Sequence, residues 1–121
     1  MGKMIIPKGV DFSFYIEIKE PHSYMPKDLT NMNQAKFTIF NYDNSETILV
    51  NYLTIVDAEN GLLLCAMTEE ETQPLVPYTA PEADRAYTKS HYHGTITVTF
   101  TDGTVPVSVY IDQVYVTPEG V

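Results

Sequence analysis

Two histidines stand two residues apart at the start of a segment rich in β-branched residues. In a β-strand, His91 and His93 would share one face, because side chains alternate between the two faces, and imidazole pairs can bind a metal ion. Further ligands would have to come from distant parts of the chain, with Asp84 and His22 as candidates. Because no third ligand lies nearby in the sequence, we predict no metal site and expect both histidines to face solvent or to anchor a loop.

The other side chains that could react are better explained by structure than by catalysis. Cys65 is the one cysteine, which excludes an intramolecular disulfide, and its apolar neighbours at 62–67 indicate a small buried side chain. Three glutamates at 69–71 follow Thr68 in the pattern of a capping box at the start of a helix. The chain has no Gly-x-Ser-x-Gly motif and no phosphate-binding glycine loop. We therefore expect no enzymatic activity and no cofactor.

The overall charge excludes one class of partner. The 121 residues include 7 Lys and Arg against 16 Asp and Glu, which gives a net charge of −9. A protein that binds nucleic acid neutralises phosphates with clustered basic side chains, and this chain has no such cluster. No apolar run approaches the roughly 20 residues of a membrane-spanning helix, and the first residues lack the pattern of a signal peptide. We expect neither a nucleic-acid nor a membrane partner.

The last third of the chain is predicted to form a long β-hairpin. Alternating β-branched residues on each side of the dipeptide Asp102-Gly103 indicate two antiparallel strands joined by a tight turn, in which the glycine takes a positive φ. The second strand changes its alternation between Ile111 and Val114. A period of two cannot make this change without an extra residue. A β-bulge is therefore predicted at Asp112-Gln113.

Shorter alternating segments precede the hairpin and predict the remaining strands. They lie at residues 11–19, 34–40, 46–56 (one bent strand or two short ones) and 62–67. The turn before the last of these ends in Asn60-Gly61, and either residue can take the left-handed φ of a tight turn. The helix that begins after Thr68 cannot continue beyond Pro74, because proline lacks the N–H group and clashes with the preceding turn.

These elements predict an all-β fold. About seven or eight short strands with turns every 8 to 12 residues or so are typical of a two-sheet antiparallel β-sandwich, Ig-like in the loose sense, here with one short helix near 69–75. We expect residues 1–121 to form a single domain. Met1 to Pro7 and Thr117 to Val121 are expected to be short terminal arms that order on assembly.

The longest irregular segment, residues 73–90, is the predicted contact surface. Prolines at 74, 77 and 81 oppose regular strand pairing, and long loops in compact domains often carry function. Charged and aromatic residues gather toward the end of this segment. The candidate contact residues are Tyr78, Glu82, Asp84, Arg85, Tyr87, Lys89 and His91.

The nine tyrosines, in a chain with no tryptophan, leave a second function open. Exposed tyrosine rings are common at protein contacts, and they can also form a platform for a sugar ring. A carbohydrate-binding module is therefore the alternative to protein assembly, unless most of these rings cover the edges of the sandwich. The tyrosines that could be partly exposed are Tyr15, Tyr42, Tyr78, Tyr87, Tyr92, Tyr110 and Tyr115.

A series of short motifs follows one another along almost the whole chain. In order, they are Lys8-Gly9, the alternating strand 12–18, Pro26-Lys-Asp-Leu-Thr30, Ala35-Lys-Phe-Thr-Ile39, Glu59-Asn-Gly61, Met67-Thr-Glu-Glu-Glu-Thr72 with Leu75, Tyr92-His-Gly-Thr-Ile96, and Ile111 to Pro118. This order resembles the small β-sandwich domains of tailed-bacteriophage virion proteins, notably the N-terminal domain of the baseplate upper protein family. The order of the motifs, rather than any one of them, carries the resemblance.

The resemblance implies a structural role in a virus particle. Domains of that family pack against other virion proteins in a ring or collar around a tail, baseplate or neck. By this resemblance, the chain is expected to be a non-catalytic virion protein, made in the cytoplasm of the host bacterium, whose partners are other virion proteins and further copies of itself. Because the sequence ends at Val121 without a receptor-binding or coiled-coil region, a tail or neck position is expected as readily as a baseplate position.

Overall fold

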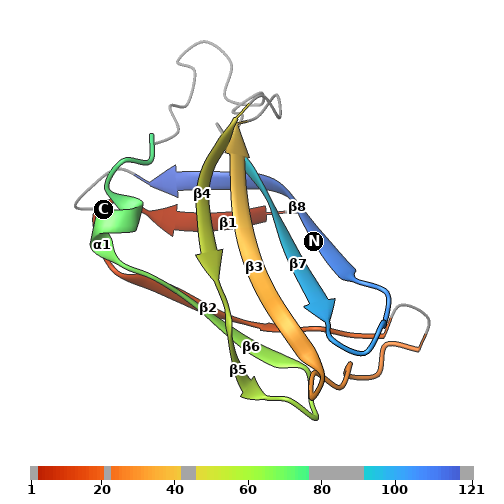
Figure 1. Cartoon of the computed structure of the whole chain (residues 1–121). Helices are drawn as coiled ribbons and strands as arrows, with labels where there is room; N and C mark the ends of the chain where they lie inside the picture. Colours follow the sequence, from red (N-terminus) through yellow and green to blue (C-terminus); the bar gives the residue numbers. More distant parts are fainter. Residues whose placement is uncertain (1–2, 21–22, 42–45, 77–91, 118–121) are drawn as a thin grey trace.

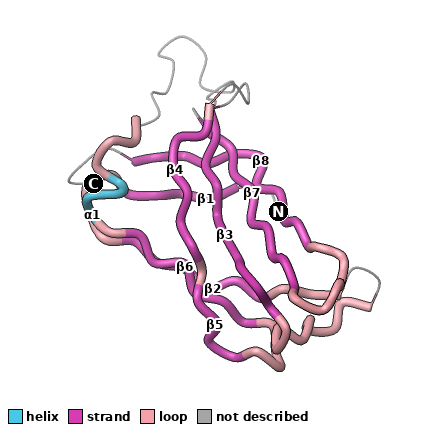
Figure 2. The backbone as a smooth tube through the Cα atoms, in the orientation of Figure 1, coloured by secondary structure: helices cyan, strands magenta, loops and turns pink. Residues whose placement is uncertain are grey.

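The computed structural model is built almost entirely of β-strands, with one short helix (Figure 1). It describes residues 3–20, 23–41, 46–76 and 92–117. Figure 2 shows the same chain with strands, helix and loops distinguished by colour. In chain order, the elements are β1 (Lys3–Pro7), β2 (Phe12–Glu17), β3 (Met32–Asn41), β4 (Thr47–Tyr52), β5 (Thr54–Asp57), β6 (Leu62–Met67), α1 (Glu69–Thr72), β7 (Tyr92–Phe100) and β8 (Val107–Thr117).

The strands form two sheets, as the alternating patterns predict. One is a five-stranded sheet in the order β1-β8-β7-β3-β4, and the other is a three-stranded sheet in the order β2-β6-β5. In Figure 1, the three-stranded sheet crosses beneath the long strands of the larger sheet. All neighbouring strands are antiparallel except β1 and β8, which are parallel. The prediction of a two-sheet, all-β fold with one short helix is confirmed.

The inward faces of both sheets share one hydrophobic core. Phe37 and Ile39 of β3, Ile96 and Val98 of β7, and Leu63 of β6 are all fully buried. The apolar side chains of β7, the first strand of the predicted hairpin, therefore face the interior. Neighbouring β2 contributes Phe14, whose ring meets that of Phe37 edge to face at a centroid distance of 5.6 Å.

The N-terminal segment differs from its prediction as a free arm. Lys3–Pro7 form β1 and pair in parallel with Gln113 to Thr117 of β8. Ile6 is fully buried, so this strand contributes to the core. The segment is short and its partner lies more than 100 residues away in the sequence, so the local pattern does not reveal the pairing.

The segment at 46–56 forms two strands that belong to different sheets. The break falls at Leu53, which is buried and whose N–H donates to the carbonyl oxygen of Ala35 at 2.9 Å. Before it, β4 closes one side of the five-stranded sheet, and after it, β5 closes one side of the three-stranded sheet. The chain therefore passes from one layer of the sandwich to the other at a single residue.

The β-bulge predicted in β8 is confirmed. Tyr92 pairs with Val114, and Gly94 pairs with Ile111. His93, the single residue between Tyr92 and Gly94, therefore faces two residues of β8. Those two residues are Asp112-Gln113, and the extra one restores the inward direction of Val114, which is fully buried.

The helix α1 begins with the predicted capping box. The N–H of Glu71 donates to Thr68 Oγ1 at 3.2 Å, and the N–H of Thr68 donates to Glu71 Oε1 at 3.0 Å. The helix is a single turn, Glu69–Thr72, and ends before Pro74 as predicted. No helix in the described part of the chain is long and apolar enough to cross a membrane.

The carboxylate of Glu71 makes the stability of the protein depend on pH. The hydrogen bond from the Thr68 N–H holds the pKa of Glu71 below its ordinary value of 4.5, and Asn51 donates a further bond at 3.0 Å. Because this pKa is lower in the folded than in the unfolded chain, the stabilisation is present above the unfolded pKa and is lost as the pH falls through the folded pKa. Glu71→Gln is therefore expected to lose less unfolding free energy than the wild type on acidification from pH 5 to about pH 3.

Urea denaturation at each pH measures this difference. Glu70→Gln is the matched control, because it removes a neighbouring carboxylate that does not belong to the capping box. The assignment is contradicted if both variants lose stability with falling pH to the same extent.

Candidate interaction surfaces

The contact surface predicted from the sequence lies outside the described residues. Its members all fall within 77–91: Tyr78, Glu82, Asp84, Arg85, Tyr87, Lys89 and His91. His22, considered as a metal ligand, also lies outside the described ranges. The surfaces that the structure does define are formed by the strand edges and by hollows between the strands.

The sequence predicted that His93 either faces solvent or anchors a loop. Because the side chain is buried, the first of these alternatives is wrong. Its side chain lies on the outward side of β7 but is only 3% exposed. The ring stacks on Phe40 at a centroid distance of 5.3 Å and lies 5.5 Å from the ring of Tyr110. Neither ring nitrogen has a hydrogen-bond partner. The alternation of the strand places His93 on the outward face. The two aromatic rings that flank it there are what the sequence pattern did not predict.

The β-bulge lies beside a hollow of about 320 Å³ next to this histidine. The hollow is lined by His93, Tyr110, Asp112 and Gln113. Tyr115 donates its hydroxyl hydrogen to Gln113 Oε1, which orients that amide. Among the described residues, no group of three or more His, Cys, Asp or Glu side chains is placed to hold a metal ion. The sequence pattern predicted the bulge itself but not the hollow beside it.

Cys65 is a buried side chain, as predicted. It is fully buried, and its thiol donates to Asn51 Oδ1 at 3.5 Å. Burial raises the pKa of the thiol to about 12, and the nearby Glu71 carboxylate adds to this effect. Because the thiolate is the reactive form of cysteine, this thiol is not poised to act as a nucleophile.

Cys65 is therefore expected to resist thiol reagents in the native protein. At pH 8, a pKa of about 12 leaves on the order of 10⁻⁴ of the thiol ionised. A chromogenic disulfide reagent should modify the folded protein at least about a hundredfold more slowly than the urea-unfolded chain. Similar rates in the two states would contradict the buried position.

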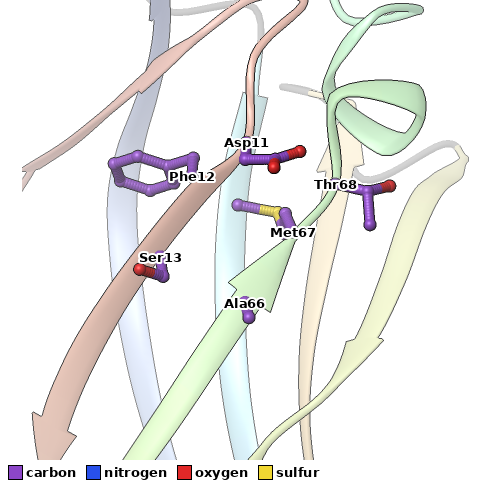
Figure 3. A pocket seen from close by; sticks show the side chains of 6 residues that line it. All are labelled: Asp11, Phe12, Ser13, Ala66, Met67 and Thr68. Carbon is purple, nitrogen blue, oxygen red and sulfur yellow. The ribbon is translucent and has the colours of Figure 1, made fainter.

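A second hollow, of about 270 Å³, lies between the start of β2 and the end of β6 (Figure 3). Figure 3 shows Asp11 at its rim, on the side of Thr68 and α1. Asp11 Oδ1 accepts a hydrogen bond from the N–H of Glu69 at 2.8 Å. The only carboxylate in the lining therefore already serves to hold the first turn of the helix. The lining residues are Asp11, Phe12, Ser13, Ala66, Met67 and Thr68.

A third hollow, of about 600 Å³, separates β2 and the residues after it from the start of β8. Its two walls come from different sheets, because β2 belongs to the three-stranded sheet and β8 to the five-stranded sheet. We call it the β2–β8 groove. It is lined by Glu17, Lys19, Glu20, Tyr24, Pro106, Val107, Ser108 and Val109.

The strands β4 and β5 together form one exposed edge. Each is the end strand of its sheet on this side of the sandwich. Residues 47–56 include no charged residue and no proline. Four large apolar side chains along them are exposed, namely Val50 (37%), Tyr52 (61%), Ile55 (42%) and Val56 (49%). We call this the β4–β5 edge, and sequence reasoning did not single it out.

The tyrosines considered for sugar binding do not gather in the described structure. Tyr15 on β2 and Tyr110 on β8 are exposed, and they lie on the outward faces of different sheets. Tyr92 is buried, and its hydroxyl accepts a hydrogen bond from the N–H of Val76 at 2.9 Å. Tyr42, Tyr78 and Tyr87 lie outside the described residues.

The fold of this chain is similar to that of a solved structure, whereas comparisons of the sequence find no match. No model of a known protein family matches the sequence, and no curated protein matches it. Among solved structures, the chain is similar to the N-terminal domain of phage TP901-1 ORF48, with 12% sequence identity and a TM-score of 0.49. The match covers 98% of this chain and 99% of that chain.

Proposed function

We propose that the chain is a non-catalytic structural protein of a bacteriophage particle, in the tail, baseplate or neck. In this role it is made in the host cytoplasm and assembles with other virion proteins and with further copies of itself. The ordered motifs along the sequence support the phage assignment. The described part of the molecule supports assembly, because its candidate surfaces are strand edges and hollows between strands.

The observation that carries the proposal is the β4–β5 edge. A strand at the edge of a sheet presents unpaired N–H and C=O groups, and monomeric proteins usually protect such edges with charge or proline. The edge strand β1 ends in Pro7, and the edge strands β2 and β5 end in the acids Glu17 and Asp57. Before Asp57, residues 47–56 of the β4–β5 edge carry neither charge nor proline, and four of their large apolar side chains are exposed. An edge of this kind is suited to pairing with another chain.

Purified particles provide the direct test. Mass spectrometry is expected to find the chain in the particle at a fixed copy number, and electron microscopy is expected to place it in a ring or collar. Replacing both Tyr52 and Ile55 by lysine should leave folding intact, since both side chains are exposed, and should reduce incorporation into particles. Glu59→Lys, on the exposed turn after β5, is the matched control for added positive charge. A protein that stays monomeric and is absent from particles would refute the proposal.

A carbohydrate-binding role is less well supported. The two exposed tyrosines among the candidates, Tyr15 and Tyr110, face away from each other on separate sheets, whereas a sugar platform needs rings on a common surface. A glycan array probed with the purified chain would decide between the two functions.

A further inference from the structure

One edge of β8 is only half occupied. On the side away from β7, β1 pairs with Gln113 to Thr117. No strand in the described part of the chain pairs with Val107 to Asp112 on that side. The backbone groups of this half of β8 that point away from β7 therefore lie open, in line with the position that β1 occupies further along (Figure 1).

The β2–β8 groove lies along this open half. Residues 106–109 form one wall, and Glu17, Lys19, Glu20 and Tyr24 form the other. The second wall is also an edge, because β2 is hydrogen-bonded to β6 alone. An extended chain in this groove would meet an unpaired strand on either side, and its volume of about 600 Å³ is suited to several residues.

The side chains in the groove are partly apolar and incompletely covered. Val107 and Val109 have the inward phase of β8, since they pair with Val98 and Ile96, which are fully buried. Both valines are nevertheless only partly buried, although they pack against the core. A further apolar side chain could therefore pack on these two valines.

Tyr24 forms an exposed aromatic rim to the groove. Its side chain is 79% exposed, and its φ is 58°, the only positive φ of a non-glycine residue in the described ranges. Tyrosine in this conformation is uncommon and costs free energy. A ring held out in this way can pack on a chain that occupies the groove.

The charge around the groove selects between possible occupants. Glu17, Lys19 and Glu20 line it. Glu17 pairs with Lys19 at 3.7 Å, and both side chains are about half exposed, whereas Glu20 pairs with Lys27 at 3.6 Å, whose side chain is only 18% exposed. An exposed pair such as that of Glu17 with Lys19 contributes little, so a basic side chain from outside can replace Lys19 there. A second copy of this chain would bring another net charge of −9, which opposes self-association at an acidic groove.

We propose that the β2–β8 groove binds an extended, basic segment of another protein by β-strand addition. The segment pairs with the open half of β8, Val107 to Asp112, in line with β1. Alternate side chains of the segment are apolar and pack on Val107 and Val109, while a lysine or arginine approaches Glu17 and Glu20. Backbone hydrogen bonds hold such a strand, and the pockets for alternate side chains select its sequence. This inference rests on the proposed assembly role and names the partner's chemistry at one surface.

A six-residue peptide, acetyl-Lys-Val-Thr-Val-Lys-Val-amide, is the probe. At saturating peptide, amide hydrogen exchange measured by NMR is expected to slow at least about tenfold at those positions of Val107 to Asp112 that point away from β7. The same peptide with its two central residues replaced by proline cannot pair as a strand and should give no protection. Absence of protection with the first peptide, or equal protection with both, would overturn the proposal.

Charge reversal tests the choice of occupant. Glu17→Lys/Glu20→Lys is expected to weaken binding of the lysine peptide about tenfold and to improve binding of the same peptide with glutamate in place of lysine. Glu59→Lys/Glu70→Lys changes the net charge equally at exposed positions outside the groove and should leave the preference for the lysine peptide intact. If the groove variant still prefers the lysine peptide to the glutamate peptide, the proposal of a basic partner is overturned.

Self-association is a separate outcome. If a second copy fills the groove, concentrated protein without peptide would show protection at Val107 to Asp112 together with dimers in sedimentation, and the proposal would fail. Absence of the chain from phage particles would refute the proposed function but would leave these peptide measurements unchanged, so the two failures can be told apart.

Discussion

Gly61→Ala is expected to lower the free energy of unfolding by about 2–5 kcal/mol, which is a large part of the stability of a domain of this size. Gly61 takes a φ of +68°, which costs an L-residue free energy. A Cβ atom at this position would also lie 2.5 Å from the carbonyl oxygen of Ile18 and 2.7 Å from that of Lys27. Both contacts are with backbone, so no side-chain rotation can relieve them.

The backbone around this glycine has little freedom to move. The N–H of Ile18 donates to the carbonyl oxygen of Gly61 at 2.8 Å, and the N–H of Lys27 donates to that of Ile18 at 2.8 Å. Gly61 therefore sits where three chain segments meet through backbone hydrogen bonds. Of the two residues that the sequence offered for the left-handed position, Asn60 and Gly61, the close approach requires the glycine.

The variant Gly103→Ala separates the cost of a positive φ from the cost of close contacts with the backbone. Gly103 also has a positive φ, +83°, but a Cβ atom there would have nothing within 4 Å. Only the conformational cost of about 1–2 kcal/mol applies to this variant. Urea denaturation, fitted with one m-value for the wild type and both variants, measures the unfolding free energy that each variant loses. If the two variants lose equal stability, the contacts of Gly61 with Ile18 and Lys27 do not contribute.

Phe37→Ala is expected to cost about 3–5 kcal/mol, because it removes a large, fully buried ring from the centre of the core. The ring lies edge to face with Phe14, and a Cβ atom on Gly94 would come within 2.5 Å of Phe37 Cε1. The absence of a side chain at Gly94 is therefore what leaves room for the ring. The glycine in the middle of β7 is explained by this close packing.

Because Phe37 occupies the space beside Gly94, the sign of the stability change caused by Gly94→Ala should depend on whether the Phe37 ring is present. In the wild type, Gly94→Ala overpacks the core and should cost about 1–3 kcal/mol. In the Phe37→Ala background the added methyl group enters the vacated space, so Gly94→Ala should be neutral or stabilising. A double-mutant cycle by urea denaturation measures the coupling. Additive losses would show that Phe37 and Gly94 do not share this space.

Tyr52→Ala is the control for removing an aromatic ring from a strand. The side chain of Tyr52 is 61% exposed at the β4–β5 edge, so little buried surface is lost. Its cost is expected to stay below about 1 kcal/mol. A loss as large as that of Phe37→Ala would place Tyr52 in contact with the core.

Several features of the fold could be predicted because their causes are local. The capping box from Thr68 to Glu71 depends on residues three apart, and the bulge at Asp112-Gln113 depends on a change of phase within one strand. The burial of Cys65 likewise follows from its apolar neighbours. Each of these arises from bonded geometry or from the alternation of a strand, which a single segment contains in full.

The candidate surfaces could not be predicted in the same way. The burial of His93 depends on rings from β3 and β8 that flank it from either side. The β4–β5 edge depends on the crossing between sheets at Leu53, which the alternating pattern of residues 46–56 does not locate. In both cases the deciding contact joins segments that no local pattern relates.

By itself, then, the sequence determined the alternation of most strands, the helix cap and the glycines that take a positive φ, because these features act within a few residues. It did not determine the length of the hairpin connection, since the tight turn predicted at Asp102-Gly103 is a longer segment between Phe100 and Val107. Only the tertiary structure decided which edges remain unpaired. The parallel pairing of Lys3–Pro7 with the end of β8 leaves Val107 to Asp112 open, and it joins residues more than 100 positions apart. Such pairings follow from closing the shared core, which is a property of the whole chain.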